Sequence, residues 1–528
     1  MQSLQSENDG KNTSTAEVVS GERLPSQKAL GKTAGSGFTW LSLTLAVGKL
    51  LSFVTQIVLG RLLLDEDFGV FAIATSIANF LRILNDGGVA QVLIQRGPAL
   101  FEKWTAPAFW IGICFSLFTG IFLAAASPWI AALYGDSQLV PLLWVFALTI
   151  VISAPTTLFK AKLRIELRFR TLAWVGTVWF FLRYLGVIYL AYRGYGAMSF
   201  VLPLPLASLF ECVAFYILTR MTPWKGGWQL HLWPSILGNS TWAMLSAFAR
   251  GLARNGDYIV LGLLVSPSLV GQYFFGYQLT AQFAILMASN VQFVLFPVLS
   301  HLATDPGRQS RAIIKTIRVM MLVSCPICLL VAINIEVLEA VLWDKKWSMA
   351  VPLMQIFSIV APIRLIPDIV HAAITSRGEF RRSANLFLLE GAFLMLSVWL
   401  AASITGANIT GIALIVATLQ TGFSLALTMI VLSNFKISIS LIVKALMPAW
   451  LCSMGAALIT VKIGNAITTD GQYFVLLAAN TAIFCALFLL FMRLFFSRRL
   501  AELAGIIPPP WDSFLLRSLF LDSSAWQN

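Results

Sequence analysis

Eleven charged residues of this 528-residue chain lie deep inside long apolar stretches, at least six residues from either end, where a charge is costly and therefore informative. Six are basic, namely Lys49, Arg82, Arg183, Arg250, Arg254 and Arg364, and five are acidic, namely Asp86, Glu211, Asp257, Asp368 and Glu390. An unpaired charge near the middle of a bilayer costs about 2.5–3.5 kcal/mol. These side chains must therefore face other helices or a water-filled cavity rather than lipid.

The spacing of some of these charges favours pairing within one helix. Residues three or four apart share a helix face, and three basic–acidic pairs have this spacing: Arg82–Asp86, Arg364–Asp368 and Arg254–Asp257. Such pairs would neutralise one another and hold helices together. This interpretation leaves Lys49 without an acid within one helical turn, and it leaves Arg250 as a second arginine beside a single acid.

The second interpretation is an anion-binding site. The planar arginine fork matches a phosphate group with two parallel hydrogen bonds. Lys49 lies in the first apolar segment and Arg250 and Arg254 lie in the seventh, so we expect them to face each other and to bind a pyrophosphate group. Arg82 and Arg364 are further candidates for substrate contact. The acids are candidates for coupling to protons or sodium, with ordinary interhelical pairing as the alternative: Asp86, Glu211, Asp257, Asp368 and Glu390.

Composition places these charges in a membrane protein. Hydrophobic residues make up 58% and charged residues 12% of the chain, and the mean hydropathy is +0.80. Soluble domains carry about 25% charged residues, which excludes a soluble enzyme, and a disordered chain would need high charge and low hydrophobicity. β-Barrel membrane proteins have weak, alternating hydropathy. The many apolar runs of about 20 residues instead predict an all-α integral membrane protein.

Fourteen apolar segments are long enough to cross a bilayer. They cover residues 38–60, 69–94, 105–126, 139–159, 171–192, 196–219, 236–265, 270–298, 314–335, 350–374, 384–404, 409–432, 440–461 and 472–495. With the N-terminus inside, the cytoplasmic loops and tails hold 26 Lys and Arg residues and the outer loops hold five. Because positive residues accumulate on the cytoplasmic side, this asymmetry predicts fourteen helices with both termini cytoplasmic.

Several functions are excluded by what the sequence lacks. The net charge of +13 comes largely from the cytoplasmic loops, and no basic soluble domain is present to bind nucleic acid. No G-x-x-x-x-G-K-[ST] phosphate loop occurs, and no loop has room for a catalytic domain. The six cysteines lie in apolar runs, and His231, His301 and His371 have no metal-binding spacing. We therefore expect no enzyme, no cofactor and no metal site.

A short internal repeat indicates duplication. The Ile-Val-Leu-Gly sequence at residues 57–60 recurs at residues 259–262, and at the same offset of 202 residues Gly69 matches Gly271. A shift of six helices preserves orientation, so the halves would be parallel bundles around a central cavity. The predicted organisation is a flexible cytoplasmic tail, two six-helix bundles, two extra transmembrane helices and a second cytoplasmic tail, covering residues 1–37, 38–235, 236–432, 433–496 and 497–528.

Four motifs follow one another between Phe38 and Arg96. They are Gly-Arg-Leu-Leu at 60–63, Asp-Phe-Gly-Val-Phe-Ala at 67–72, Asn-Asp-Gly-Gly at 85–88 and Ala-Gln-Val-Leu-Ile-Gln-Arg at 90–96. This stretch resembles the polysaccharide transporter family, the Wzx-type oligosaccharide flippases of the MOP exporter superfamily. The fourteen-helix plan and the parallel halves agree with this resemblance over the rest of the chain.

The resemblance implies export of undecaprenyl-pyrophosphate-linked oligosaccharide repeat units across the bacterial inner membrane by alternating access, for lipopolysaccharide or exopolysaccharide synthesis. It implies a lipid-linked oligosaccharide and membrane lipids as partners, with a polysaccharide polymerase and chain-length proteins as further candidates. It supplies no ligand motif, so the anion-site residues rest on charge placement. A MATE-like antiporter for cationic small molecules is the alternative. Its cavity would favour acids, whereas this chain has six intramembrane bases and five acids.

Overall fold

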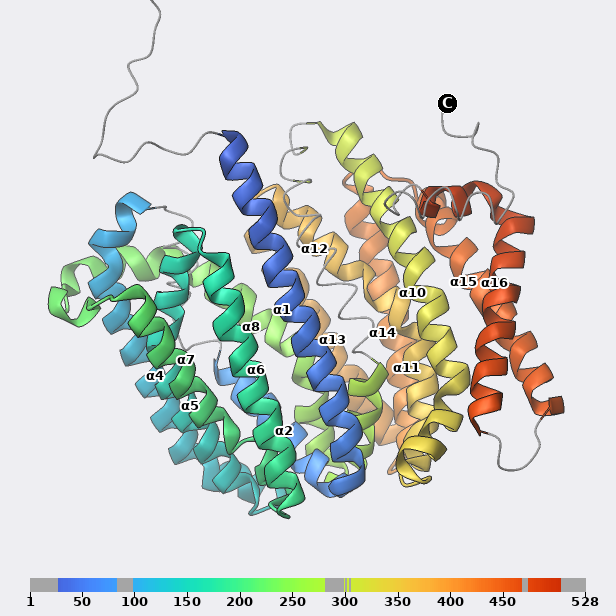
Figure 1. Cartoon of the computed structure of the whole chain (residues 1–528), viewed down its shortest axis with the longest axis horizontal. Helices are drawn as coiled ribbons and strands as arrows, with labels where there is room; N and C mark the ends of the chain where they lie inside the picture. Colours follow the sequence, from blue (N-terminus) through green and yellow to red (C-terminus); the bar gives the residue numbers. More distant parts are fainter. Residues whose placement is uncertain are drawn as a thin grey trace, which may run out of the picture.

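The computed structural model describes residues 27–82, 98–280, 299, 302, 305–467 and 473–504, and every regular element in these ranges is a helix (Figure 1). The α-helices are α1 (Gln27–Leu62), α2 (Asp65–Arg82), α4 (Pro98–Tyr134), α5 (Leu139–Ile165), α6 (Phe169–Tyr192), α7 (Pro203–Thr219), α8 (Trp233–Leu264), α10 (Pro306–Trp343), α11 (Val351–Arg364), α12 (Ile366–Ser376), α13 (Phe380–Thr405), α14 (Ile409–Ser433), α15 (Ile439–Ile467) and α16 (Tyr473–Ala504). Short 3-10 helices are η1 (Gly196–Phe200), η2 (Pro223–Gly226), η3 (Leu230–Leu232) and η4 (Ser348–Ala350).

Eleven helical segments of the described residues are long and apolar enough to cross a membrane, and they coincide with eleven of the fourteen predicted spans. α8 coincides with the seventh predicted span and carries Arg250, Arg254 and Asp257 within it. α2 and residues 267–280 form the starts of the second and eighth predicted spans, whose remaining residues lie outside the described ranges. The prediction of an all-α integral membrane protein is confirmed.

The ends of the helical region differ slightly from the predicted boundaries. α1 begins at Gln27, inside the segment predicted as a flexible tail, although its membrane-spanning part begins at Thr39. At the other terminus α16 continues to Ala504, with a break in helical geometry at Phe496, where the last predicted helix ends. Polar residues in the first turns of a helix do not stop it from forming, so apolarity marks the membrane span rather than the whole helix.

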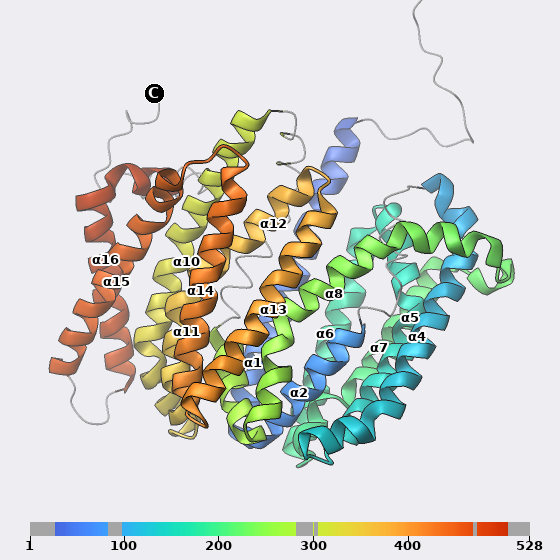
Figure 2. The same cartoon turned by 180° about the vertical axis from the view of Figure 1, so that it is seen from behind.

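The helices form two sets (Figures 1 and 2). α1, α2 and α4–α7 make up the first set, α8 and α10–α14 make up the second, and α15 and α16 lie along α10 at the outer edge of the second set. The start of α1 and the end of α16 lie at the same end of the molecule, here named the terminal end. The opposite end, formed by residues 60–69, 265–271 and 341–350, is named the far end.

α8 makes contact with both sets (Figure 2). Its first residues, including Ile236 and Leu237, share an apolar cluster with Phe101 and Trp104 of α4. Further along, α8 packs closely against α13, where a Cβ at Gly391 would lie 2.9 Å from the side chain of Leu252. α8 therefore links the two sets. The predicted boundary between the two six-helix bundles at residue 236 stays a prediction.

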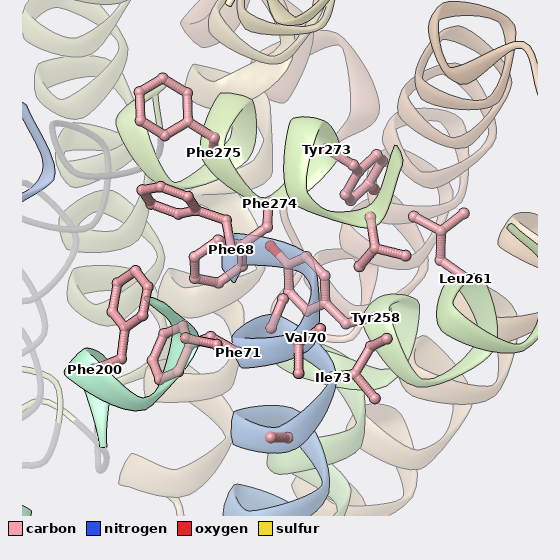
Figure 3. Packing of buried hydrophobic residues seen from close by; sticks show 14 of the residues in the cluster. Phe68, Val70, Phe71, Ile73, Phe200, Tyr258, Leu261, Tyr273, Phe274 and Phe275 are labelled. Atoms are coloured by element: carbon pink, nitrogen blue, oxygen red, sulfur yellow. The ribbon is translucent and has the colours of Figure 1, made fainter. Parts of the chain in front are cut away.

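The largest apolar core joins the two sets around the far end (Figure 3). Phe68 of α2 packs edge-on against Phe200, Phe275 and Trp347, with ring centroids 5.2, 5.3 and 5.2 Å away. Phe71, one helical turn later, stacks on Phe200 at 4.2 Å. In a membrane such contacts hold helices together by close packing rather than by exclusion of water.

The internal repeat reappears as reciprocal contacts between the sets. A Cβ at Gly69 would lie 1.7 Å from the carbonyl oxygen of Pro267, and a Cβ at Gly271 would lie 1.7 Å from that of Asp65. Asp65 and Pro267 are themselves 202 residues apart, as are the two glycines. Each set thus offers the same backbone contact to the other, which is the contact pattern of a two-fold axis. Only glycine permits so close an approach.

A second pair of contacts follows the same symmetry. The Tyr134 hydroxyl at the end of α4 donates to the carbonyl of Ile259 at 3.0 Å, and the Trp343 indole at the end of α10 donates to the carbonyl of Ile57 at 2.9 Å. Ile57 and Ile259 are 202 residues apart. The repeat predicted from residues 57–60 and 259–262 therefore corresponds to equivalent places in the two sets.

Candidate anion-binding site

Two arginines of α8 lie beside an acid of α12. The guanidinium Nη2 of Arg254 is 3.6 Å from Oδ1 of Asp368, and the Arg254 side chain is 60% exposed. Arg250, one helical turn earlier, lies with its guanidinium carbon 5.3 Å from the centre of the Phe387 ring and within electrostatic range of both Arg254 and Asp368. An exposed, loosely paired guanidinium retains donors for a second anion.

Lys49 of α1, in the first set, lies near the same two arginines. Its ammonium group lies within electrostatic range of Arg254. We define the basic site as Lys49, Arg250, Arg254 and Asp368. Lys49 precedes Gly60 by eleven residues, which is about 16 Å along α1 at 1.5 Å per residue. With a hydrocarbon core of about 30 Å, the basic site lies near the middle of the membrane.

Arg364 belongs to a different, buried network. It lies within electrostatic range of Asp257 and Tyr273, and its guanidinium carbon is 5.4 Å from the centre of the Tyr277 ring. Asp257 is only 3% exposed, and it accepts hydrogen bonds from the Tyr258 amide and the Tyr273 side chain. The charge of Arg364 is therefore balanced inside the second set, where it stabilises packing.

The pairing predicted from helical spacing is wrong for these residues. Arg254 contacts Asp368 rather than Asp257, and Arg364 lies with Asp257 rather than with Asp368. The reason is a break in the predicted tenth span, because α11 ends at Arg364 and α12 begins at Ile366 with Pro367 in its first turn. Residues on two helices do not share a helix face, so the four-residue spacing of Arg364 and Asp368 carries no meaning there.

The first set holds a second group of charges. Arg82 at the end of α2 lies within electrostatic range of Arg183 and Glu211. The Arg183 guanidinium carbon is 5.4 and 5.3 Å from the ring centres of Trp179 and Tyr184. Glu211 forms an ion pair with Lys160 of α5 at 2.7 Å, so ordinary interhelical pairing is the interpretation that the geometry favours for it. Asp86 lies outside the described residues.

His371 was missed by the reasoning from sequence, which searched histidines only for metal-binding spacing. Its Nε2 is 3.5 Å from Oε2 of Glu390, and its Nδ1 is 3.0 Å from the hydroxyl of Ser383. Its ring stacks on Phe387 with the centroids 3.5 Å apart. Asp368 lies within electrostatic range of His371. The three-residue spacing of Asp368 and His371 on α12 is the sequence signal that could have identified this group, because residues at that spacing share a helix face.

The far end is closed by hydrogen bonds between the two sets. Arg61 at the end of α1 donates to the carbonyls of Val341 and Leu342 at the end of α10. In return Lys346, which follows α10, donates to the carbonyls of Arg61 and Leu63 at 3.2 and 2.6 Å. The last carbonyls of a helix lack partners within it and carry partial negative charge, so each cation stabilises the other helix's end.

Two further contacts strengthen this closure. The Trp347 indole donates to the carbonyl of Gly60 at 2.9 Å. The carboxylate of Asp65 accepts hydrogen bonds from Ser268 at 2.6 Å and from Gln272 at 3.2 Å. We name Arg61, Asp65, Ser268, Lys346 and Trp347 the far-end latch. These contacts hold the two sets together at the far end.

No group of three or more His, Cys, Asp or Glu residues in the described part of the chain is arranged to hold a metal ion. The protein is thus a helical membrane protein with two symmetry-related sets of helices, a basic site between them and a latch at one end. These features define a membrane transporter of the alternating-access class.

The comparisons agree with this class and give the family. A family model described as "Polysaccharide biosynthesis protein" matches residues 58–352, which is more than half of the chain. The chain therefore belongs to the polysaccharide biosynthesis protein family, whose transporters form part of the MOP superfamily. The teichuronic acid biosynthesis protein TuaB of Bacillus subtilis (strain 168) is 22% identical over 398 residues, covering 74% of this chain and 81% of TuaB. The succinoglycan biosynthesis transport protein ExoT of Rhizobium meliloti (strain 1021) is 23% identical over 335 residues, covering 63% of this chain and 67% of ExoT.

Solved structures show the same fold. The lipid II flippase MurJ, in an inward closed conformation, is 13% identical with a TM-score of 0.68, covering 87% of this chain and 98% of MurJ. An inward-facing MATE family multidrug transporter of the MOP superfamily is 12% identical with a TM-score of 0.61, covering 74% of this chain and 94% of the transporter. The predicted fold class is confirmed, and the chain is a multi-pass membrane transporter rather than an enzyme.

Proposed function

We propose that this protein moves undecaprenyl-pyrophosphate-linked oligosaccharide repeat units from the cytoplasmic to the outer leaflet of the bacterial inner membrane. The observation that carries the proposal is the basic site, where Lys49 of one set lies within electrostatic range of Arg254 of the other, and Arg250 and Arg254 lie beside the acid Asp368. Among these four described side chains the basic ones outnumber the acidic one by three to one, which suits the site to a pyrophosphate. The names of TuaB, ExoT and the lipid II flippase MurJ support this substrate class.

The mechanism follows from where the charges and the latch lie. The pyrophosphate binds at the basic site near the middle of the membrane, with Arg254 offering its fork of donors and Asp368 holding the guanidinium in place. The sugars occupy the polar space between the sets, while the lipid tail stays in the bilayer. The far-end latch separates the site from the outer side until the two sets rock apart, and anion release follows.

The orientation belongs to the same proposal. α1 begins and α16 ends at the terminal end, and the excess of Lys and Arg predicted for the loops of that end supports a cytoplasmic location for it. The far end then faces the outer side of the inner membrane. The exported units serve lipopolysaccharide or exopolysaccharide synthesis, and a polysaccharide polymerase and chain-length proteins are the protein partners to test.

A MATE-like antiporter for cationic drugs is the alternative, since the fold is shared. The charge of the basic site decides against it, because a bound cation would meet three basic side chains. An antiporter of this kind would show itself as altered drug susceptibility in a deletion strain.

The test is a clean deletion complemented with the wild-type gene, with an Arg250→Gln/Arg254→Gln double variant, and with Arg193→Gln as a control. Arg193 is exposed beyond the end of α6 and far from the basic site in the chain. We expect the double variant to be made and inserted normally, to lose surface polymer, and to retain undecaprenyl-linked repeat units that mass analysis of the lipid extract detects. Normal polymer in the double variant would refute the site, and unchanged lipid intermediates in the deletion would refute the function.

A further inference from the structure

The second set contains a buried acid–histidine pair directly behind the basic site. Nε2 of His371 on α12 lies 3.5 Å from Oε2 of Glu390 on α13, and the two side chains are 6% and 9% exposed. The other carboxylate oxygen of Glu390, Oε1, is buried without a hydrogen-bond partner among the described residues. A buried, half-satisfied carboxylate is costly, so this pair is a place where a proton is stabilising.

The pair is connected to the basic site through two contacts. Phe387 stacks on the His371 ring at 3.5 Å and lies 5.3 Å from the guanidinium carbon of Arg250. Asp368, the ion-pair partner of Arg254, lies within electrostatic range of both His371 and Glu390. A change of charge at His371 therefore reaches the anion site at short distance and in a poorly screened interior.

The described charged groups around His371 come from several helices. α8 contributes Arg250 and Arg254 and α12 itself contributes Asp368. α13 contributes Glu390, and it carries Arg381 and Arg382 directly before Ser383 in its first turn. α14 has no ionisable residue in its sequence, and Arg364 of α11 is engaged with Asp257. α10, which packs against α12 through the Gln309–Ser376 hydrogen bond, carries Lys315 and Arg318 in its next turns.

We infer that the His371–Glu390 pair binds a proton that raises the affinity of the basic site for a pyrophosphate-bearing ligand. The inference rests on the proposed function. With His371 neutral, Asp368 and Glu390 both oppose the three cations of the site. When the His371 imidazole takes up a second proton from water, the imidazolium offsets the charge of Glu390, so that of these two acids only Asp368 still opposes the cations. No covalent bond forms or breaks.

Thermodynamic reciprocity gives the sign of the effect. If protonation strengthens anion binding, anion binding must strengthen protonation by the same factor. The ligand therefore binds more tightly at low pH, and its binding takes up a proton.

The chemistry of the group favours a proton over a metal cation. Sodium-like and divalent hard cations take several oxygen ligands, whereas His371 presents ring nitrogens to Glu390 and Ser383. The described residues contain no cluster of three side chains arranged to hold a metal. Both imidazole nitrogens face groups that accept a hydrogen bond, an arrangement that the doubly protonated ring satisfies in full.

The experiment uses the full chain in lipid nanodiscs and farnesyl pyrophosphate as the probe. Titration calorimetry at pH 6 and pH 8, in buffers of different ionisation enthalpy, gives the affinity and the number of protons taken up. The two pH values bracket the ordinary titration range of histidine. We expect the wild type to bind about fivefold or more tightly at pH 6 than at pH 8. The probe's own protonation is common to all variants, so the difference between variants reports the protein.

Two variants are expected to move the affinity in opposite directions. His371→Gln keeps Glu390 unopposed and should bind weakly at both pH values, without the extra proton uptake. Glu390→Gln removes the opposing charge and should bind tightly at both, including at pH 8. General damage to the fold would weaken both variants, so the opposite signs separate the inference from instability. His231→Gln, on exposed η3, is the matched control and should behave as the wild type.

The outcomes distinguish this inference from the function it rests on. No binding of the probe by the wild type at either pH would overturn the proposed anion site. Binding with the same pH dependence in His371→Gln as in the wild type would leave that site standing and overturn the role of His371. Affinity that follows the sodium concentration at fixed pH, with no extra proton uptake in the wild type, would overturn the proton as the bound ion.

Discussion

Arginines of the second set differ in what surrounds them, and this difference separates binding from stability at the scale of single residues. Arg254 is 60% exposed and contacts one acid at 3.6 Å. Arg364 is enclosed by Asp257 and three tyrosines. Removing an exposed, loosely held cation takes little away from the fold. Removing a buried partner leaves an uncompensated charge, which costs about 3–5 kcal/mol.

We therefore expect Arg254→Gln and Arg364→Gln to fail in different ways. Arg254→Gln should keep the thermal stability of the wild type in detergent and lose polymer export. Arg364→Gln should melt at a lower temperature and accumulate to a lower level, because Asp257 loses its balancing charge. Fluorescence-detected size exclusion after heating, combined with a polymer assay, measures both. An Arg364→Gln protein that is fully stable but does not export polymer would show that Arg364 takes part in substrate binding.

The positions of charges inside the membrane could be predicted from the sequence, but the partners of these charges could not. The cost of charge in a bilayer identifies Lys49, Arg250 and Arg254 without any structure, and the structure brings these three together. The pairing of Arg254 with Asp368 depends on how α8 packs on α12, which no local spacing encodes. His371 was missed because its contact with Glu390 joins two helices at positions nineteen residues apart, which no local spacing encodes.

At the scale of helices, the close approach of α2 to residues 267–280 depends on two glycines. A methyl group at Gly69 or Gly271 would lie 1.7 Å from a backbone oxygen of the other set, and a backbone oxygen cannot rotate away. We expect Gly69→Ala and Gly271→Ala each to force the sets apart at the far end and to lower both thermal stability and export. Gly112→Ala on α4 has open space around the new methyl group and is the matched control.

The two glycine variants also test the symmetry. Because each occupies the equivalent place in its own set, their effects on melting temperature should be similar in size. A large effect at one position and none at the other would mean that the reciprocal contact is not what holds the far end closed. The double variant should add little to either single one, since both changes open the same contact.

Helix positions were predictable because membrane spans are long apolar runs, and eleven described segments coincide with predicted ones. The break after Arg364 was not, since Pro362 and Pro367 are compatible with a kink or a complete break. The helical start of α1 within the predicted tail was also missed, because hydropathy identifies only the apolar part of a helix and not its extension into water.

At the scale of the whole molecule, the hydrogen bonds of the far-end latch are compatible with the proposed mechanism, in which the two sets separate at the far end. Arg61 and Lys346 bind carbonyl oxygens of the opposite set, and neither forms an ion pair with the described residues of that set. Water can take the place of each of these hydrogen bonds. Burial lowers the pKa of the Lys346 ammonium, against the attraction of Asp65 and Asp67, and opening would relieve that desolvation. Such a latch can hold the two sets together at the far end and still open.

A disulfide across the latch tests whether the two sets must separate for export. Ser268 donates to Asp65 at 2.6 Å from one set to the other, so Asp65→Cys/Ser268→Cys places two thiols in close proximity, in a background where the six native cysteines are replaced. We expect the oxidised double variant to bind farnesyl pyrophosphate but to export no polymer, and a reductant to restore export. Each single cysteine variant controls for loss of the hydrogen bond itself. Export by the cross-linked protein would mean that substrate leaves without opening of the far end, and the alternating-access mechanism proposed for this chain would have to be abandoned.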